Sequence, residues 1–151
     1  MKKIILAMSA CFSVSVMATG VDTLVADFQK ADQDCNRVAK AFESHQPAAN
    51  ERQDRFDNSA CYTWVVKTAM AEQPNNKNDI LMAALSAAHE RAESVTSGAI
   101  QGGMTPMMAV ARANEILPNH RDEISRGAIS AGVDPSVVTE ATAAGIAKTI
   151  Q

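Results

Sequence analysis

GAIQGGMTP, residues 98–106, recurs later in the chain as GAISAGVDP, residues 127–135. The similarity continues beyond both segments. At the same offset, Glu93, Val95, Met108 and Ala109 align with Asp122, Ile124, Val137 and Val138. In each copy glycine predicts the end of one helix, and the Thr-Pro or Asp-Pro after it predicts the cap and first residue of the next. The second half of the chain is therefore expected to form a small stack of helix-turn-helix repeats.

The composition is that of a globular protein, with 46% hydrophobic and 21% charged residues in a chain of 151. Residues 1–18 have the order of a secretory signal peptide: two lysines, an apolar run, and small residues before a cut after Ala18. A lipoprotein cut before Cys11 is the less favoured alternative, because it leaves a very short signal and an apolar stub behind. The sequence thus predicts an exported protein, periplasmic or extracellular.

Cleavage removes Lys2 and Lys3 from the 14 basic residues and none of the 17 acidic ones, so the net charge falls from −3 to −5. This sign argues against a nucleic-acid partner. No later apolar run is long enough to span a bilayer, so we expect no stable membrane insertion. Cys35 and Cys61 then remain as a pair, and in an oxidising compartment they predict a disulfide. Closing a loop of this length stabilises a fold by about 3 to 4 kcal/mol in the chain-entropy model.

Apolar residues spaced three and four apart predict a first helix from Val21 to about Ser44, with Cys35 on its buried face. Pro47 ends it. Asn50 and Gln53 have the spacing of a capping box, and a second helix is expected to follow to about Glu72. Its expected inward residues are Phe56, Ala60 or Cys61, Trp64, Val65 and Thr68. The disulfide would clamp these helices into an antiparallel hairpin over residues 19–75.

The C-terminal repeat region, residues 76–151, is expected to pack with the hairpin as one compact domain. A third helix begins near Asn78 or Asp79, and we favour a bend near His89 over one helix running through to Gln101. Three further helices are predicted. They run from Pro106 to about Leu117, from about Asn119 to Ala131, and from Pro135 to about Lys148. All 5 prolines fall at or beside these boundaries, and the predicted fold class is all-α.

One segment of the first helix resembles the calcium-binding loop of an EF-hand. Asp32, Asp34, Asn36 and Glu43 occupy positions 1, 3, 5 and 12 of that pattern. Arg37 stands where the loop needs glycine, and the apolar periodicity of the helix passes straight through. A solvated acidic helix face is the favoured interpretation.

Met104, Met107 and Met108 form a cluster of thioethers, which are ligands suited to Cu(I). The aligned residues of the second copy include Val133 and Val137. We therefore favour core packing for the methionines over copper binding.

No catalytic signature is present. The 3 histidines, His45, His89 and His120, lie far apart in the sequence, and none has a metal-ligand partner nearby in the chain. The acidic pair Asp122 and Glu123 falls in a predicted first helical turn, where the helix dipole favours negative charge. The sequence predicts no catalytic residue and no cofactor.

Arg52, Arg55, Tyr62 and Trp64 form the candidate protein-binding patch, because Arg, Tyr and Trp dominate interface energetics. The competing interpretation is a core Trp with charges outside it. We expect a non-enzymatic protein that binds an unidentified partner protein. Two alternatives stay open: a self-associating structural or matrix protein, and a protein that binds calcium or copper.

Overall fold

The computed structural model describes residues 20–44 and 58–149, and within them it is all-helical, with no strand. The helices are α1 (Val21–Ser44), α2 (Asn58–Glu72), α3 (Lys77–Ala87), the short 3-10 helix η1 (His89–Arg91), α4 (Ala92–Gln101), α5 (Pro106–Ile116), α6 (Arg121–Ser130) and α7 (Pro135–Thr149). The expected boundaries of the first helix and of the C-terminal helices are confirmed to within one to two residues. The predicted signal peptide and the capping box at Asn50 and Gln53 lie outside the described residues.

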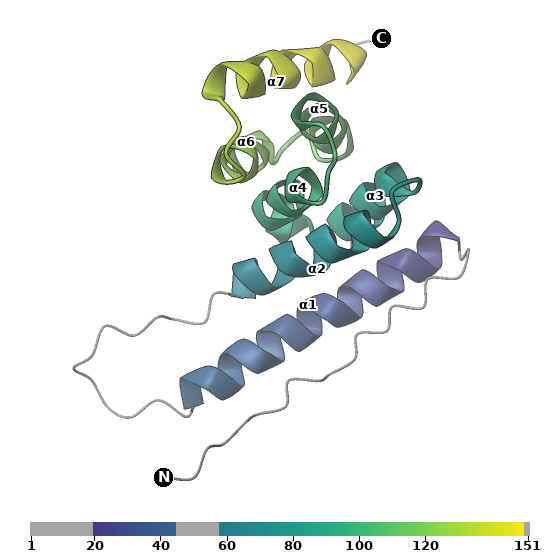
Figure 1. Ribbon diagram of the computed structural model, residues 1–151, viewed down its shortest axis with the longest axis vertical. Helices are drawn as coiled ribbons and strands as arrows, with labels where there is room; N and C mark the ends of the chain where they lie inside the picture. Colours follow the sequence, from purple (N-terminus) through teal and green to yellow (C-terminus); the bar gives the residue numbers. More distant parts are fainter. Residues whose placement is uncertain (1–19, 45–57, 150–151) are drawn as a thin grey trace, which may run out of the picture.

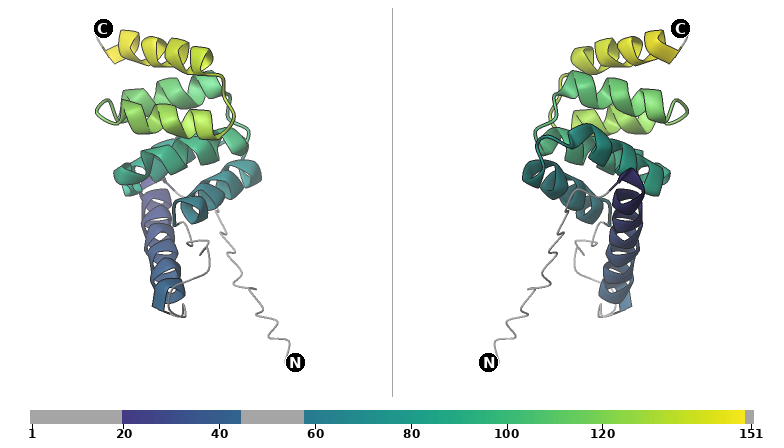
Figure 2. Two further views of the ribbon diagram at one scale, coloured as in Figure 1. Left: turned by 90° about the vertical axis from the view of Figure 1, so that its left-hand side faces the viewer. Right: turned by 90° about the vertical axis from the view of Figure 1, so that its right-hand side faces the viewer.

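The helices form a two-layered stack (Figure 1). In one layer α2 packs on α4 and α4 on α6; in the other, α3 packs on α5 and α5 on α7. α1 crosses the lower end and contacts both α2 and α3. Side views show α1 at one end of the stack and α7 at the other (Figure 2).

The repeat seen in the sequence is a structural repeat. Shifting α3 and α4 by the offset of the sequence repeat gives the bounds of α5 and α6. Gly103 and Gly132, which also align, both have positive φ, 92° and 89°. Each follows the end of a helix, and the residue after each makes the same turn hydrogen bond, Met104 N–H to Ala99 O in one copy and Val133 N–H to Ala128 O in the other.

The two copies of the repeat differ in how the helix after the glycine turn is capped at its N-terminus. Asp134 accepts a hydrogen bond from the Ser136 N–H, 2.8 Å, and caps α7 as predicted. Thr105 has an extended backbone at the corresponding position but makes no side-chain cap bond, so the predicted Thr cap is wrong. Pro106 compensates in part, because at the first helical position it presets φ and lacks an N–H to satisfy.

The predicted bend near His89 is confirmed as a full break between α3 and α4. Ala88 leaves the helical region, with φ −147° and ψ 73°. Leu117, at the aligned position, has φ −125° and ψ 72°. The break therefore belongs to the repeat unit and does not depend on Pro118, which only the second copy has.

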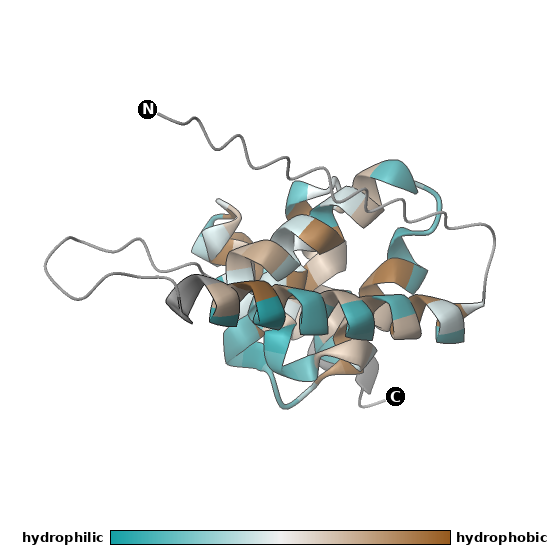
Figure 3. Cartoon of the chain, turned by 90° about the horizontal axis from the view of Figure 1, so that it is seen from below, coloured by the Kyte–Doolittle hydropathy of each residue, from teal (hydrophilic) through white to brown (hydrophobic). Residues whose placement is uncertain are grey.

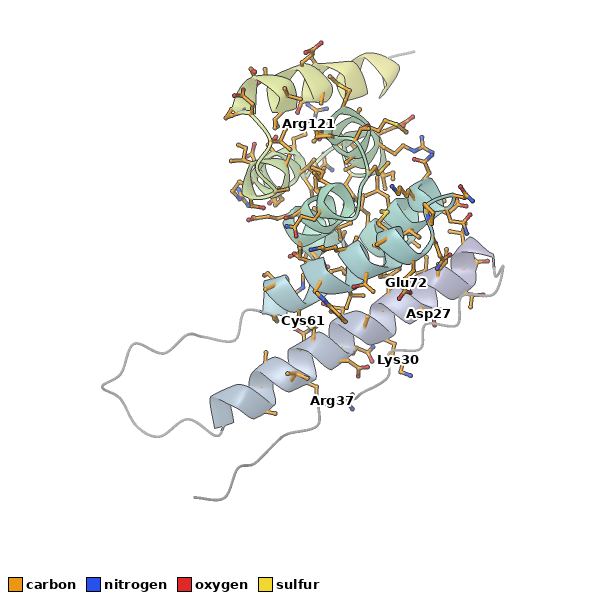
Figure 4. The ribbon with its side chains drawn as sticks, in the orientation of Figure 1. Asp27, Lys30, Arg37, Cys61, Glu72 and Arg121 are labelled. Atoms are coloured by element: carbon orange, nitrogen blue, oxygen red, sulfur yellow. A yellow bond between two sulfur atoms is a disulfide. The ribbon has the colours of Figure 1, made fainter. Side chains whose placement is uncertain are left out.

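The disulfide between Cys35 and Cys61 joins α1 to α2 with a Cα–Cα distance of 5.8 Å, as predicted. Figure 4 shows Cys61 on the side of α2 that faces α1, and the two helices run antiparallel in Figure 1. Viewed from below, hydrophilic and apolar residues alternate along α1 (Figure 3), as expected for a helix that buries one stripe.

The predicted inward face of α2 is wrong in part. Cys61 faces α1 through the disulfide and Val65 packs against the core, as predicted, but Ala60 and Trp64 are exposed. Tyr62, Val66 and Met70 are the fully buried side chains, whereas Trp64 is 56% exposed. Tyr62 packs edge-on against Phe28 of α1, with ring centroids 6.3 Å apart, and its hydroxyl donates to Ala84 O of α3 at 3.3 Å. Val65 and Thr68 are only partly buried. Phe56 lies outside the described residues.

Candidate functional site: a groove beside Trp64

A groove of about 470 Å³ lies on the outer side of the layer formed by α2, α4 and α6. It is lined by Ser59, Ala60, Thr63, Trp64 and Lys67 of α2, by Glu93, Ser94, Ser97 and Gln101 of α4, and by Ser130 of α6. The groove thus spans all three helices of this layer.

Gly98 of α4 and Gly102, the residue directly after α4, bring α2 and α4 close together at the groove. A Cβ on Gly98 would lie 2.6 Å from Thr63 O, and one on Gly102 would lie 2.8 Å from Lys67 O. Any larger residue would push the helices apart. In the next repeat, a Cβ on Gly127 of α6 would lie 2.3 Å from Glu93 O of α4. The same device therefore sets both helix spacings along the groove.

Most of the residues that line the groove are Ser, Thr or Gln, which are polar and uncharged. The Thr63 hydroxyl donates to Ser94 O at 3.3 Å, and the Gln101 amide donates to Ser97 Oγ at 3.0 Å. These hydrogen bonds restrict the rotamers of the Thr63 and Gln101 side chains in the groove. Lys67 and Glu93 are its ionisable residues, and the Glu93 carboxylate is paired with Arg126 of α6 at 2.9 Å. The pair raises the pKa of Arg126.

Trp64 is the large apolar group at the groove. It is the only Trp of the chain, and more than half of its surface is open to solvent. Its ring therefore offers apolar contact area beside hydroxyl and amide groups, a combination that suits binding more than catalysis.

No family model, curated protein or solved structure was found to match this chain. Among the described residues, no helix is both long and apolar enough to cross a membrane. Inference about function therefore rests on the site itself.

The candidate patch of Arg52, Arg55, Tyr62 and Trp64 is divided by the structure. Tyr62 is fully buried, so its assignment to a binding surface is wrong. Burial, with Asp32 and Glu90 adding to it, raises the pKa of the Tyr62 hydroxyl well above its usual value. Arg52 and Arg55 lie outside the described residues. Of the four residues, only Trp64 is found at the surface. No pattern in the sequence indicated the groove residues of α4 beside it.

The segment that resembles a calcium loop is helical throughout, because α1 runs unbroken from Val21 to Ser44. Asp32 accepts a hydrogen bond from Arg91 Nε at 3.0 Å, and Asp34 is paired with Arg37. Asn36 accepts from Arg91 Nη2 at 2.8 Å, and Glu43 follows two helical turns later. The predicted helix is confirmed, but the prediction of a solvated acidic face is wrong for Asp32 and Asp34, whose side chains are 16% and 23% exposed. Asp32 and Asn36 instead anchor α1 to the stack.

The three methionines of the copper candidate sit in different environments. Met104 is buried, Met107 packs partly against the core, and Met108 is 51% exposed on α5. Core packing therefore describes Met104 and Met107, as favoured from the sequence, and does not describe Met108.

The structure brings together two histidines that are distant in the sequence. The rings of His89 and His120 meet edge-to-face, with centroids 5.8 Å apart. His89 opens η1, and His120 directly precedes α6. Each histidine lies in the connection that leads to the second helix of its repeat, so stacking the repeats places them side by side. The spacing of residues within a single helix could not predict this contact, because the two histidines belong to different repeats.

Proposed function

We propose that the protein is exported and acts without catalysis, by binding a partner protein in the groove beside Trp64. The observation that carries the proposal is the exposure of this Trp next to a polar groove. Trp is the residue type most enriched among those that dominate binding energy. In a stable monomer it would gain more by packing inward, as Tyr62 does two residues earlier.

The lining indicates the kind of contact that a partner would make. Hydroxyl and amide groups from α2 and α4 suit the main chain or polar side chains of another protein, while Trp64 supplies the apolar anchor. Lys67 adds a positive charge near the Trp, which favours an acidic group on the partner. Support for export comes from the composition of residues 1–18 and from the disulfide.

Comparative capture from the native envelope fraction tests the proposal. Immobilised wild-type protein, the Trp64→Ala variant and a Met108→Ala control would be compared by quantitative mass spectrometry. Met108 is a matched control because it is 51% exposed but lies on α5, in the other layer. We expect proteins enriched by wild type and by Met108→Ala to be lost with Trp64→Ala. Equal enrichment by all three would contradict the proposal.

A photo-crosslinking residue in place of Gln101 would then identify which captured protein lies in the groove. Gln101 is exposed and lines the groove from α4, opposite Trp64 on α2. A crosslinker at Met108 provides the control. Crosslinks from position 101 that Trp64→Ala abolishes would establish direct contact, whereas equal crosslinking at both positions would indicate non-specific association.

Self-association through α6, at the end of the layer formed by α2, α4 and α6, is the second candidate. Ile129 of α6 is 47% exposed, whereas the aligned Ile100 of α4 packs against the core. α6 is the last helix of its layer in the described residues. Sedimentation of wild type and Ile129→Lys over a range of concentrations tests this function. A wild-type monomer at high concentration would contradict it.

A further inference from the structure

The rings of His89 and His120 lie as close together as two ligands of one metal ion. Imidazole nitrogens bind Zn²⁺ at about 2.0 to 2.1 Å, so two rings on one ion have centroids about 5 to 6.5 Å apart, depending on the angle at the metal. The observed separation is 5.8 Å, with an angle of 67° between the ring planes. Binding requires rotations about the side-chain bonds that turn the rings out of this edge-to-face contact, so that one nitrogen of each ring points at the ion.

The pair is accessible from solvent. The His89 side chain is 65% exposed, and the neighbouring Glu90 side chain is 60% exposed. Glu90 places a carboxylate oxygen 3.6 Å from His89 Nδ1. The distance is too long for a hydrogen bond, but the negative charge of Glu90 beside the pair favours a bound cation. Arg91 does not compete for the site, because its guanidinium is engaged by Asp32, Asn36 and Asn58.

We propose that His89 and His120 together bind one divalent transition-metal ion of the copper and zinc group at the junction between the two repeats. Imidazole is the ligand type that suits Zn²⁺, Cu²⁺ and Ni²⁺. In the described residues no group of three or more His, Cys, Asp or Glu is arranged to hold a metal. Water or a ligand from another molecule therefore completes the coordination, which makes the site open and the ion exchangeable.

The repeat architecture accounts for the site. His89 lies one short 3-10 turn before α4, and His120 lies immediately before α6. α4 and α6 pack directly on one another, with Gly127 against the backbone of Glu93. The helix spacing that this glycine permits therefore also sets the distance between the two rings. A bound ion would bridge consecutive repeats and oppose their separation.

Calorimetric titration of the untagged, disulfide-bonded mature protein with Zn²⁺ tests the proposal. We expect one ion per chain, and a loss of affinity of about tenfold or more in His89→Ala and in His120→Ala, because the second imidazole binds intramolecularly. The double variant should also lose the weak binding that the remaining imidazole gives each single variant. His45→Ala is the matched control, since it removes a histidine from the same chain and leaves the pair intact; its affinity should equal that of wild type.

A second readout needs no variant. Substoichiometric Cu²⁺ should broaden the imidazole proton resonances of His89 and His120 together, because both rings contact the same paramagnetic ion. Weakening by only one of the two single variants, or broadening of only one ring, would indicate a single-histidine ligand and overturn the proposal. Zn²⁺ affinity unchanged in both variants would also overturn it.

Discussion

Asn114 is a residue whose chemistry conflicts with its place in the core. Its side chain is 2% exposed, and neither its amide nitrogen nor its oxygen has a hydrogen-bond partner in the described residues. The aligned residue of the earlier repeat is Leu85, which is fully buried. Nearby in the chain, Arg121 has a buried Nε without a hydrogen-bond partner in the described residues, where the earlier repeat has Ala92. The second repeat therefore carries polar groups at positions that the first fills with apolar ones.

Replacing Asn114 by Leu is predicted to stabilise the fold by about 1 to 3 kcal/mol, because the substitution removes two unsatisfied buried groups and restores the residue type of the first repeat. Urea unfolding followed by circular dichroism would measure the change. The reverse substitution, Leu85→Asn, should destabilise by a similar or larger amount. A destabilised Asn114→Leu would indicate that the amide is hydrogen-bonded, for example to a buried water.

The buried Tyr62 makes the stability of the fold depend on pH at alkaline pH, because burial raises the pKa of its hydroxyl above the ordinary value of 10.0. The folded state then holds the proton more tightly than the unfolded state. This contribution to stability is complete below pH 10 and is lost as the pH rises from there towards the folded pKa. Tyr62 is the only Tyr, so tyrosinate absorbance reports it alone.

We expect the absorbance of folded protein to titrate at a higher pH than that of protein unfolded in urea. The Tyr62→Phe variant provides the baseline for both titrations. Identical midpoints in the two states would contradict the burial of this side chain.

Helix spacing depends on the glycines of α4 and α6. Gly127→Ala is predicted to destabilise the fold by about 1 to 3 kcal/mol, because the new Cβ would overlap the Glu93 carbonyl at 2.3 Å. The sign is informative, since in an unconstrained helix the same change stabilises by about 1 kcal/mol. Gly20→Ala is the control, as its Cβ would meet nothing within 4 Å. A stabilised Gly127→Ala in chemical denaturation would mean that α4 and α6 are not in close contact.

The attachment of α1 depends on Arg91. Its guanidinium donates to Asp32 and Asn36 of α1 and to Asn58 of α2, and its side chain is largely buried. Arg91→Ala is predicted to cost about 2 to 4 kcal/mol, because the largely buried Asp32 carboxylate would lose its charged partner and keep only the hydrogen bond from Asn36. Arg112→Ala removes an exposed pair with Glu115 and should change stability by less than about 1 kcal/mol. Equal effects of both substitutions in thermal unfolding would contradict the anchoring role.

Element boundaries followed from the sequence because they depend on local signals. Pro106, Pro135 and the glycines at 103 and 132 act within a few residues, and α1 has a single apolar stripe. The buried face of α2, in contrast, could not be predicted from the sequence. Apolar residues occupy four of the positions from 62 to 66, on more than one side of the helix: Tyr62 and Val66 are buried, Val65 packs at the edge of the core and Trp64 is exposed. Apolar periodicity alone could not choose the buried face. That choice is made by α1 and α3, through Phe28 and Ala84.

At the scale of the whole molecule, the stack determines which residues meet. The sequence predicted the repeats and the disulfide but not the groove, because the groove depends on how α2, α4 and α6 align side by side. The same holds for His89 and His120, which the packing of one repeat on the next brings together. Sites of this kind lie between repeats, and no single helix contains enough of one to be recognised in the sequence.

The proposed function depends on the groove face being open, with its Trp in solvent. Trp64 is the only Trp, so intrinsic fluorescence and its quenching by acrylamide measure the exposure of this residue directly. For folded, disulfide-bonded protein at low concentration we predict an emission maximum close to that of the urea-unfolded chain and a quenching constant at least half as large. A blue-shifted emission that acrylamide barely quenches would place Trp64 in the core and contradict both the register of α2 and the groove.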